Sequence, residues 1–535
     1  MADLIVVDPN LPRADRMVLE SLIRDIREER DYEDEMVDGE HDEKNEKKKT
    51  GEELAMSNGR PAAGKPIPGP DAALLATLDA LNDPASGAFE PTVFTSIDLL
   101  DLRQAVATAR KAAAVAAVAA DTGSGSGHGD ADMDMDIAAK TKSTLWAQAT
   151  GGLYAGLQRF LLEPYVRLVR RHVVRYETDV VFATHLLLYF ATVVPSAATL
   201  LLVRFTWLHG LLHAVAVLGG CMGSYTIMMH QHIHQGGVLR RDRWWTAAVD
   251  RLFPYLLDPL FGHTWNSYYY HHVKHHHVEG NGPDDLSSTM WYRRDSLRDF
   301  GRYLGRFLLL AWFDLPRYFA RTRRYGSALR AGFWELASYG LLGGSCYLGG
   351  SSRSPYALAV HVTDVRAAVC VFVIPFVVMR VGLMLGNWGQ HAFVDPDAPA
   401  SDFRSSITLL DVASNRVCFN DGYHTSHHLN PRRHWREHPR AFVAQKRTYA
   451  AEQGLVFFGV DYLMISLRLL LFQDYAYLAR RLVPLGPAQR RLTLDERAAL
   501  LRRLTAPFSA ADVARTFPKS RAAAAWRRKQ GLPAA

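Results

Sequence analysis

Apolar and polar positions divide this chain of 535 residues into regions of unlike character. Roughly the first 140 residues are polar, charged or alanine-rich, with a dense run of mixed charge at 24–54 and the composition of a flexible linker at 121–136. From about 145 to 480 the chain is apolar and aromatic. We therefore predict a disordered or weakly helical region over 1–140, a membrane domain over 141–480 and a basic helical tail over 481–535.

Four apolar runs within the second region predict an all-α integral membrane fold with four transmembrane helices in two hairpins. Val180–Val203 and Phe205–Met229 carry no formal charge over 24 and 25 residues, enough to cross a hydrocarbon core of about 30 Å. Phe333–Gly350 and Ala367–Gln390 contain one charge each and form a less clean second pair. Weaker patterns at 146–176, 252–262, 303–313 and 455–472 predict interfacial or half-buried helices.

The distribution of positive charge orients these helices. Residues 235–332, between the two hairpins, contain 15 Lys and Arg, whereas the two opposite loops contain only Arg204, Arg353 and Arg366. By the positive-inside rule, 235–332 and both termini lie on the cytosolic side. Arg380, inside the fourth run, must face protein or a water-filled cavity, and either a structural or a functional role suits it.

Composition narrows the functional classes. The four cysteines lie far apart in apolar settings, at Cys221, Cys346, Cys370 and Cys418, without CxxC spacing. This pattern argues against a disulfide scaffold, a zinc ribbon or a thiol redox motif, and it predicts four buried, reduced thiols. The net charge of +7 is modest for the length, and we expect membrane and lipid partners and no nucleic acid.

Histidine is concentrated in four short windows, which hold 12 of the 22 histidines in the chain. The windows are HQHIH at 230–234, HHVKHHH at 271–277, NWGQH at 387–391 and YHTSHH at 423–428. Each is weak alone, because a pair such as His230 and His234, four apart on one helix face, is more often incidental. The predicted topology nevertheless places all four windows on the cytosolic side, and hydropathy used no information about histidine. This agreement indicates a shared metal site.

The number of histidines indicates two metal ions. Imidazole suits iron, copper, nickel and zinc, and a single zinc ion would use fewer than half of this set. Eight or nine neutral nitrogen ligands with open positions suit iron that must bind and activate O2. Glu279, Asp284 and Asp285 follow the second window, either as acceptors for the other N–H groups of the rings or as ordinary loop carboxylates.

Over roughly residues 180–480 these windows resemble those of the integral-membrane fatty-acid desaturase and hydroxylase superfamily. The resemblance implies a cytosolic helical cap that holds a di-iron site above the transmembrane helices, with a hydrophobic tunnel for an acyl chain. The implied ligands are His230, His234, His272, His275, His276, His424, His427 and His428, with His391 as a ninth and Asn387 bound through water.

The second window allows more than one spacing. HxxHH from His272 is the assignment that we adopt, which leaves His271 and His277 beside the site. HxxxHH also fits, either from His271 through His275 and His276 or from His272 through His276 and His277.

The resemblance implies an O2-dependent desaturase that acts on the acyl chain of a lipid, an acyl-CoA or a sphingolipid. NDGYHTSHHLNP at 420–431 is similar to the pattern of sphingolipid desaturases, and His424 in place of Gln argues against front-end desaturases. Because the chain has no HPGG haem motif, the electron donor must be separate, either cytochrome b5 or ferredoxin. The acidic N-terminus favours the endoplasmic reticulum over a plastid. A lipid hydroxylase on the same scaffold is the alternative, and a zinc-dependent membrane hydrolase or a metal transporter is a remote one.

Two further histidine pairs stay outside the predicted site. His209 and His213 lie about 25 Å or more along the second run from His230, near the opposite face of the membrane. His434 and His438 follow the last window, and we predict that they belong to a basic cytosolic surface, with a role beside the metal ligands left open.

Overall fold

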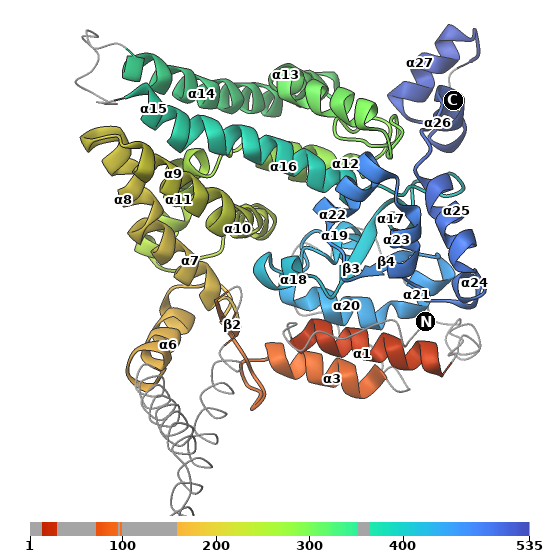
Figure 1. The fold of residues 1–535 in the computed structure, drawn as a ribbon, viewed down its shortest axis with the longest axis horizontal. Coiled ribbons are helices and arrows are strands. Elements are labelled where there is room, and N and C mark those ends of the chain that lie inside the picture. The colour runs from red at the N-terminus through yellow and green to blue at the C-terminus, as the bar shows by residue number, and fades with distance from the viewer. Residues whose placement is uncertain (1–12, 29–70, 95–96, 99–157, 351–363, 534–535) are drawn as a thin grey trace, which may run out of the picture. The chain divides into compact units, whose positions relative to one another are not determined.

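The computed structural model describes residues 13–28, 71–94, 97–98, 158–350 and 364–533. They belong to two compact units, one drawn from 1–79, 192–236 and 253–535 and the other from 80–191 and 237–252. Both units are mostly helical, as the sequence predicts (Figure 1).

The smaller unit contains one antiparallel strand pair and several helices. The strands are β1 (Thr92–Phe94) and β2 (Ile97–Asp98), and the helices include α6 (Glu163–His172) and α7 (Val180–Ala191). Helix α6 buries Val166 and Val169 and directs arginines outward, so this part of the predicted amphipathic segment 146–176 is an amphipathic helix. Residues 146–157 lie outside the described part of the chain.

Three helical segments are long and apolar enough to cross a membrane, namely Val180–Val203, Trp207–Gln235 and Val365–Gln390. They correspond to three of the four predicted spans. The fourth, Phe333–Gly350, forms the second part of α14 (Tyr325–Gly350), a continuous helix whose glycines and serines make it less apolar than the other three. The four-span topology therefore stays a prediction.

π-Helical turns interrupt each of the three apolar segments. The first comprises α7, α8 (Val193–Ala198) and η5 (Thr199–Val203). The second comprises α9 (Trp207–Val215), η6 (Ala216–Cys221) and α10 (Met222–Gln235), and the third α15 (Val365–Ala368), η9 (Val369–Val373) and α16 (Ile374–Gln390).

Helices α13 (Leu297–Arg321), α14 and α16 run side by side in the larger unit (Figure 1). A buried ion pair between Glu335 and Arg380 joins α14 to α16. The Arg380 guanidinium also lies 5.0 Å from the ring centre of Phe307 and 4.9 Å from that of Phe376. Arg380 therefore faces protein, where it connects two helices. The short runs predicted at 252–262 and 303–313 are parts of longer helices, α11 (Trp244–Leu260) and α13.

A three-stranded sheet in the larger unit corrects the all-α prediction. Strand β4 (Leu455–Phe458) pairs parallel with β3 (Ile407–Leu410) and antiparallel with β5 (Leu482–Val483). The run LVFF, bounded by Gly454 and Gly459, is buried on both faces, and a short continuous apolar run cannot be told from a helix by periodicity. Residues 455–472 are thus a strand followed by α22 (Tyr462–Leu467) and η11 (Arg468–Phe472), rather than one helix.

Two segments of the N-terminal region, which the sequence predicted to be disordered or weakly helical, form helices. Helix α1 (Arg13–Arg27) buries Val18, Leu19 and Leu22 on one face, and α3 (Asp71–Asn82) follows it. Buried Lys446 pairs with Asp25 of α1 and Asp71 of α3, which ties both helices to α21 (Lys446–Ala451). The average composition of the region concealed this amphipathic stretch of 15 residues.

The remaining elements complete the larger unit. Helix α17 (Asp402–Ser405) precedes β3. Between β3 and β4 the chain forms α18 (Ala413–Val417), α19 (His424–Leu429), η10 (Trp435–Glu437) and α20 (His438–Ala444). The C-terminal region, predicted to be helical, contains α23 (Tyr475–Arg481), α24 (Pro487–Arg490), α25 (Leu494–Leu504), α26 (Ala510–Thr516) and α27 (Arg521–Lys529). Helix α25 buries Leu501 and Leu504 against the sheet. All four cysteines are free, as predicted, but only Cys370 is fully buried and the other three are partly exposed.

Candidate metal centre

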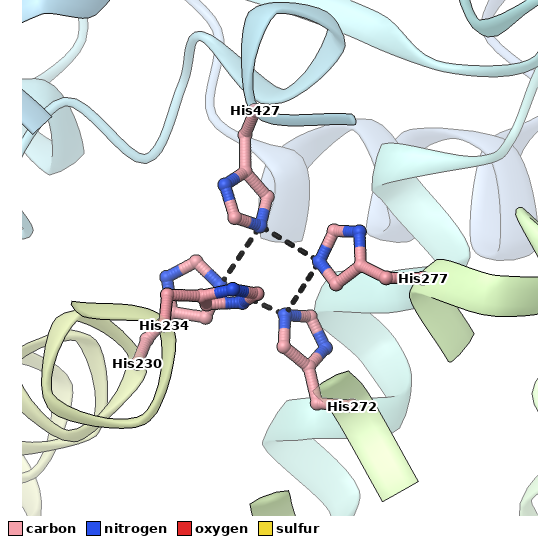
Figure 2. Close-up of side chains that lie close together, drawn as sticks. All are labelled: His230, His234, His272, His277 and His427. Carbon is pink, nitrogen blue, oxygen red and sulfur yellow. Dashed lines mark hydrogen bonds between the residues drawn. The ribbon is translucent and has the colours of Figure 1, made fainter. Parts of the chain in front are cut away.

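Five histidines from three separate segments meet in one cluster (Figure 2). They are His230 and His234 of α10, His272 and His277 of the second window and His427 of α19. The Nε2 of His230 lies 2.8 Å from that of His272 and 3.1 Å from that of His427. The Nε2 of His277 lies 3.1 Å and 2.8 Å from the same two atoms. The ring of His234 packs against the other four, with centroid distances of 4.6 to 5.0 Å.

The four facing nitrogens suit a cation. A neutral imidazole nitrogen either donates its single hydrogen or accepts one, so at most two of the four short contacts around this ring of Nε2 atoms can be hydrogen bonds. Nitrogens separated by 2.8 to 3.1 Å around a square lie about 2 Å from its centre, the distance at which imidazole binds first-row metals. This donor set fits a metal ion.

Three more histidines form a second cluster, and a fourth adjoins it. The cluster comprises His276, His391 and His428, all buried. The Nε2 of His424 lies 3.2 Å from that of His391, and its ring centre lies 4.6 Å from that of His428. Two groups of buried, converging ring nitrogens are thus present, which matches the two metal ions that the number of histidines indicated.

Rings of the second cluster are oriented by hydrogen bonds on their outer sides. The Nδ1–H of His276 donates to Asp285 at 2.6 Å, and that of His391 donates to the carbonyl oxygen of Ser405 at 2.8 Å. The Nδ1 of His428 lies 3.5 Å from a carboxylate oxygen of Asp402. The opposite nitrogens, Nε2 of His276 and of His428, are buried without a hydrogen-bond partner. An outer acceptor with a bare inner nitrogen is the usual arrangement of a metal-binding histidine.

A π-helical backbone explains which histidines of the second window converge. Residues Tyr269–His276 form π-helix η7, and α12 (His277–Glu279) continues it. On an α-helix, His272 would share its face with His275 and His276. In the wider π turn, the residues four and five positions after His272 lie on that side of the helix. His272 therefore contacts His276 and His277. The convergent spacing is therefore HxxxHH from His272, one of the alternatives that the sequence left open, rather than HxxHH.

His275 and His271 lie outside both clusters. The Nε2 of His275 accepts the backbone N–H of Leu286 at 2.9 Å, and its ring packs against Tyr318 with a centroid distance of 4.1 Å. His271 packs its ring 5.7 Å from that of Phe307. Neither ring is placed to share an ion with the cluster residues.

Of the three nearby carboxylates, only Asp285 contacts cluster histidines. Glu279 accepts the hydroxyl of Tyr318 at 2.5 Å, and Asp284 accepts the backbone N–H of Arg521 at 2.8 Å. Asn387 donates its amide to the carbonyl of Ser287 at 3.0 Å and to the hydroxyl of Tyr303 at 2.8 Å. Sequence reasoning did not identify Asp402 or the Ser405 carbonyl, because neither belongs to a histidine window.

Electrostatics favour the neutral form of five of the clustered rings. Burial, reinforced by neighbouring rings, holds the pKa of His272, His277, His391, His424 and His427 well below the ordinary value for histidine. Burial alone would raise the pKa of Asp285, but the adjoining His276 and His275 lower it well below its usual range. Neutral rings around an anionic outer acceptor are the form in which histidine binds a metal.

A cavity of about 410 Å³ ends at these rings. Apolar side chains such as Met222, Ile227, Met379 and Leu383 line most of it. Its polar end is formed by His230, His271, His272, His276, His424 and Asn387. An apolar chain that enters this cavity therefore reaches both clusters.

Comparison with known proteins identifies the region that contains the site. The model of the family described as fatty acid desaturase matches residues 205–460. These residues belong to the fatty acid desaturase family. No curated protein and no solved structure matches the chain. All the clustered histidines lie inside the desaturase region, whereas α1, α3, α25, α26 and α27 lie outside it.

The remaining histidine pairs of the desaturase region lie apart from the metal centre or at its margin. His209 and His213 both contact the hydroxyl of Ser196, at 2.9 Å and 3.0 Å, and are not part of either cluster. The Nδ1 of His438 lies 3.0 Å from the hydroxyl of Ser426, and its ring centre lies 6.1 Å from that of His427. His438 is therefore buried beside the first cluster rather than on an open surface.

Proposed function

We propose that this protein is an O2-dependent membrane desaturase that introduces a double bond into a fatty-acyl chain. Its family is one of oxidoreductases that act on fatty acids. The observation that carries the proposal is the presence of two histidine clusters at the end of one apolar cavity. A hydrolase with a single zinc ion would use only one of the two clusters.

We assign one iron ion to each cluster. The ligands of the first would be His230, His234, His272, His277 and His427. The ligands of the second would be His276, His391, His424 and His428, with Asn387 bound through water. This assignment includes His277 in place of His275, because the nitrogens of His277 and not those of His275 approach the other rings.

When bound, iron would activate O2 as the oxidant, with two electrons from an external donor, so that hydrogen can be removed from an unactivated C–H bond. The cavity holds the acyl chain in register and excludes water from it. Asp285 accepts the Nδ1–H of His276, which fixes the tautomer and directs Nε2 inward. The amide of Asn387 is held by Ser287 and Tyr303 with its own oxygen free to accept a hydrogen bond.

The same proposal extends to the setting of the enzyme. Four membrane spans with cytosolic termini would place both clusters in a cytosolic cap, reached by cytochrome b5 or ferredoxin as a separate electron donor. The basic segment 235–332 supports this orientation. The segment NDGYHTSHHLNP supports a sphingolipid or another acyl lipid as substrate.

The test is a lipid profile of yeast that expresses the full chain. Fatty acids and sphingoid bases are analysed by chromatography and mass spectrometry, and metal content is measured on the purified protein. A double variant, His427→Ala with His428→Ala, removes one ring from each cluster, and His434→Ala provides a matched control outside them.

We expect a new double bond in cells with the native chain and the His434→Ala control, and none with the double variant. A new hydroxyl group in its place would assign the protein to the hydroxylases. Zinc in place of iron in the purified protein, or an unchanged profile despite two bound irons and each candidate lipid supplied, would overturn the proposal.

A further inference from the structure

The smaller unit carries a surface that the proposed activity does not use. We call it the α6 surface, and it consists of helix η4 (Gln158–Leu162), helix α6 and residues 240–244. The guanidinium of Arg240 donates to the carbonyl oxygen of Arg171 at 3.3 Å, and that of Arg243 donates to Nδ1 of His172 at 2.9 Å. These hydrogen bonds join the two helices to the later segment, so that the parts form one continuous surface.

Large apolar side chains are exposed on the α6 surface. Phe160, Leu161 and Leu168 of the helical part are 72%, 64% and 58% exposed, and Trp244 is 84% exposed. The buried valines of α6 lie on the opposite side of the helix. Apolar side chains gathered on one exposed face mark a surface that binds another protein or a membrane.

The same surface is positively charged. Residues 158–179 and 237–252 contain nine Arg and no Lys, against five Asp and Glu. Three of the carboxylates form ion pairs, namely Glu177 with Arg170, Asp242 with Arg240 and Asp250 with Arg241. Among the residues that the structure describes, no carboxylate forms an ion pair with Arg167, Arg171 or Arg243, and all three are exposed. The α6 surface therefore suits an anionic partner.

Two segments that are long and apolar enough to cross a membrane flank this surface in the sequence. One begins at Val180, eight residues after α6 ends at His172, and another ends at Gln235, five residues before Arg240. By the positive-inside rule, the arginines favour the cytosolic side for these ends of the two segments. Anionic phospholipids give the cytosolic leaflet a negative surface potential, which attracts arginines next to a membrane segment.

The arrangement of side chains on α6 suits the surface of a lipid bilayer. Arg167 and Arg171 lie one turn apart on the exposed side of the helix, next to Leu168. A helix of this kind lies in the headgroup layer, where its apolar side chains reach the acyl chains and its guanidinium groups contact phosphate. Because candidate membrane segments adjoin both parts of the surface in the chain, a lipid layer is favoured over a soluble protein as its partner.

We propose that the α6 surface binds anionic phospholipids of the cytosolic leaflet. Arg167, Arg171 and Arg243 contact the headgroups, and Leu168 and Trp244 enter the boundary between headgroups and acyl chains. The inference depends on a membrane position for Val180–Val203 and goes beyond the proposed desaturation, because these lipids are bound at the edge of the protein and are not its substrate. Both η4 and α6 precede the residues that match the desaturase family, so most of this surface lies outside that region.

Photocrosslinking to the full-length protein in vesicles tests the proposal without requiring turnover. The vesicles contain three parts of phosphatidylcholine to one part of phosphatidylserine. A trace of either lipid, with a diazirine close to its headgroup, is added and activated, and mass spectrometry measures its yield on peptides from 158–179 and 237–252. The variant is R167Q with R171Q and R243Q. Its matched control is R521Q with R528Q and K529Q, which removes the same charge from exposed positions of α27.

On these peptides of the native chain, we expect the yield from phosphatidylserine to exceed that from phosphatidylcholine about threefold or more. The glutamine variant should bring the ratio close to one, and the α27 control should keep it. R167K with R171K and R243K keeps the charge and should keep most of the preference. Raised salt should lower the ratio of the native chain, because it screens exposed charges.

Equal yields from the two lipids on the native chain would overturn the proposal, as would an equal loss of preference in the variant and the α27 control. If an acidic soluble protein suppressed the labelling of these peptides by both lipids, the surface would instead be a protein docking site. The outcome is separate from the proposed activity. A chain that forms no unsaturated product could still show the lipid preference, and an active desaturase with equal yields would refute it.

Discussion

The two histidine clusters differ in what holds their rings in place. In the first cluster, the rings of His230, His272, His277 and His427 contact one another through their Nε2 atoms at 2.8 to 3.1 Å. In the second, each of the rings of His276, His391 and His428 has an oxygen acceptor near its outer nitrogen. The first cluster is organised by mutual ring packing, and the second by surrounding hydrogen bonds.

This difference has a consequence for the order of assembly. Hydrogen bonds from the scaffold fix the second cluster before any ion arrives, which lowers the cost of binding. Facing nitrogens in the first cluster repel one another unless a cation or a proton lies between them. We therefore expect the second cluster to depend on its outer acceptors and the first to depend on every one of its rings.

The largest effect should come from removing a ring of the first cluster. His277→Ala should abolish desaturation and lower the iron content by about one equivalent, because it removes a ligand whose Nε2 faces two others. Iron per protein and product per cell are the measurements.

His275→Ala provides the contrast within the same window. It should keep both irons and cost about 1–3 kcal/mol of stability, since His275 is buried and accepts the N–H of Leu286. If His275→Ala lost iron and His277→Ala kept it, the HxxHH spacing would be the right one and the π-helical assignment would fail.

Replacing Asp285 should affect the second cluster selectively. Asp285→Asn leaves the Nδ1–H of His276 with a weaker acceptor and should lower the affinity of the second ion by about 10–100-fold, with the first ion retained. Metal titration of the apoprotein would measure the two steps.

Asp284→Asn is the matched control, because Asp284 accepts the backbone N–H of Arg521 and contacts no ring. Asp402→Asn should cause a smaller loss than Asp285→Asn, since its oxygen lies 3.5 Å from His428 and its side chain is 33% exposed. If Asp285→Asn lowered the affinity for both ions equally, the two clusters would not be supported independently.

The sequence predicted which histidines lie in this site better than it predicted which of them cluster together. Hydropathy and spacing placed four histidine windows on one side of a membrane, and residues from all four windows meet in the structure. The choice between His275 and His277 depended on a π-helix, and the residue pattern was interpreted at α-helical spacing. Asp402 was missed because a distant carboxylate carries no local signal.

The fold shows the same limit. Long uncharged runs predicted three segments that the structure forms as helices long and apolar enough to cross a membrane. Strand β4 was mistaken for part of a helix because four buried apolar residues have no periodicity. Helix α1 was not singled out because only 15 residues of a long polar and charged region carry its amphipathic pattern.

Acidification tests a property that the two clusters share, the lowered pKa of their buried rings. Burial holds the folded-state pKa of His272, His277 and His391 well below 6.5, the ordinary value that the unfolded chain recovers. The unfolded state therefore binds more protons below pH 6.5, so stability is present above that pH and is lost as the pH falls. Each such ring contributes a slope of about 1.4 kcal/mol per pH unit.

The thermal midpoint of the iron-free protein in detergent should fall steeply from pH 6.5 to pH 5, and bound iron should shift the fall to lower pH. A midpoint that is flat or rises over this range would mean that the buried rings are already charged.

The smallest effect should come from replacing Asp15. This replacement tests whether a residue outside the clusters supports one of them or both. Buried Asp15 of α1 accepts hydrogen bonds from the hydroxyl of Tyr423 at 2.6 Å and from the backbone N–H of Asp411 at 2.9 Å. Tyr423 directly precedes α19, which supplies histidines to both clusters. Asp15→Asn directs an amide toward these donors and should cost about 1–3 kcal/mol of stability.

Because α19 supplies histidines to both clusters, this variant should lower the affinity for the two ions to a similar, small extent, unlike Asp285→Asn. Tyr423→Phe should have a comparable effect, and the double variant should cost less than the sum, since the two residues share one hydrogen bond. Additive losses, or a loss confined to one ion, would show that α1 does not act through Tyr423. Helix α1 would then stabilise the unit without positioning its histidines.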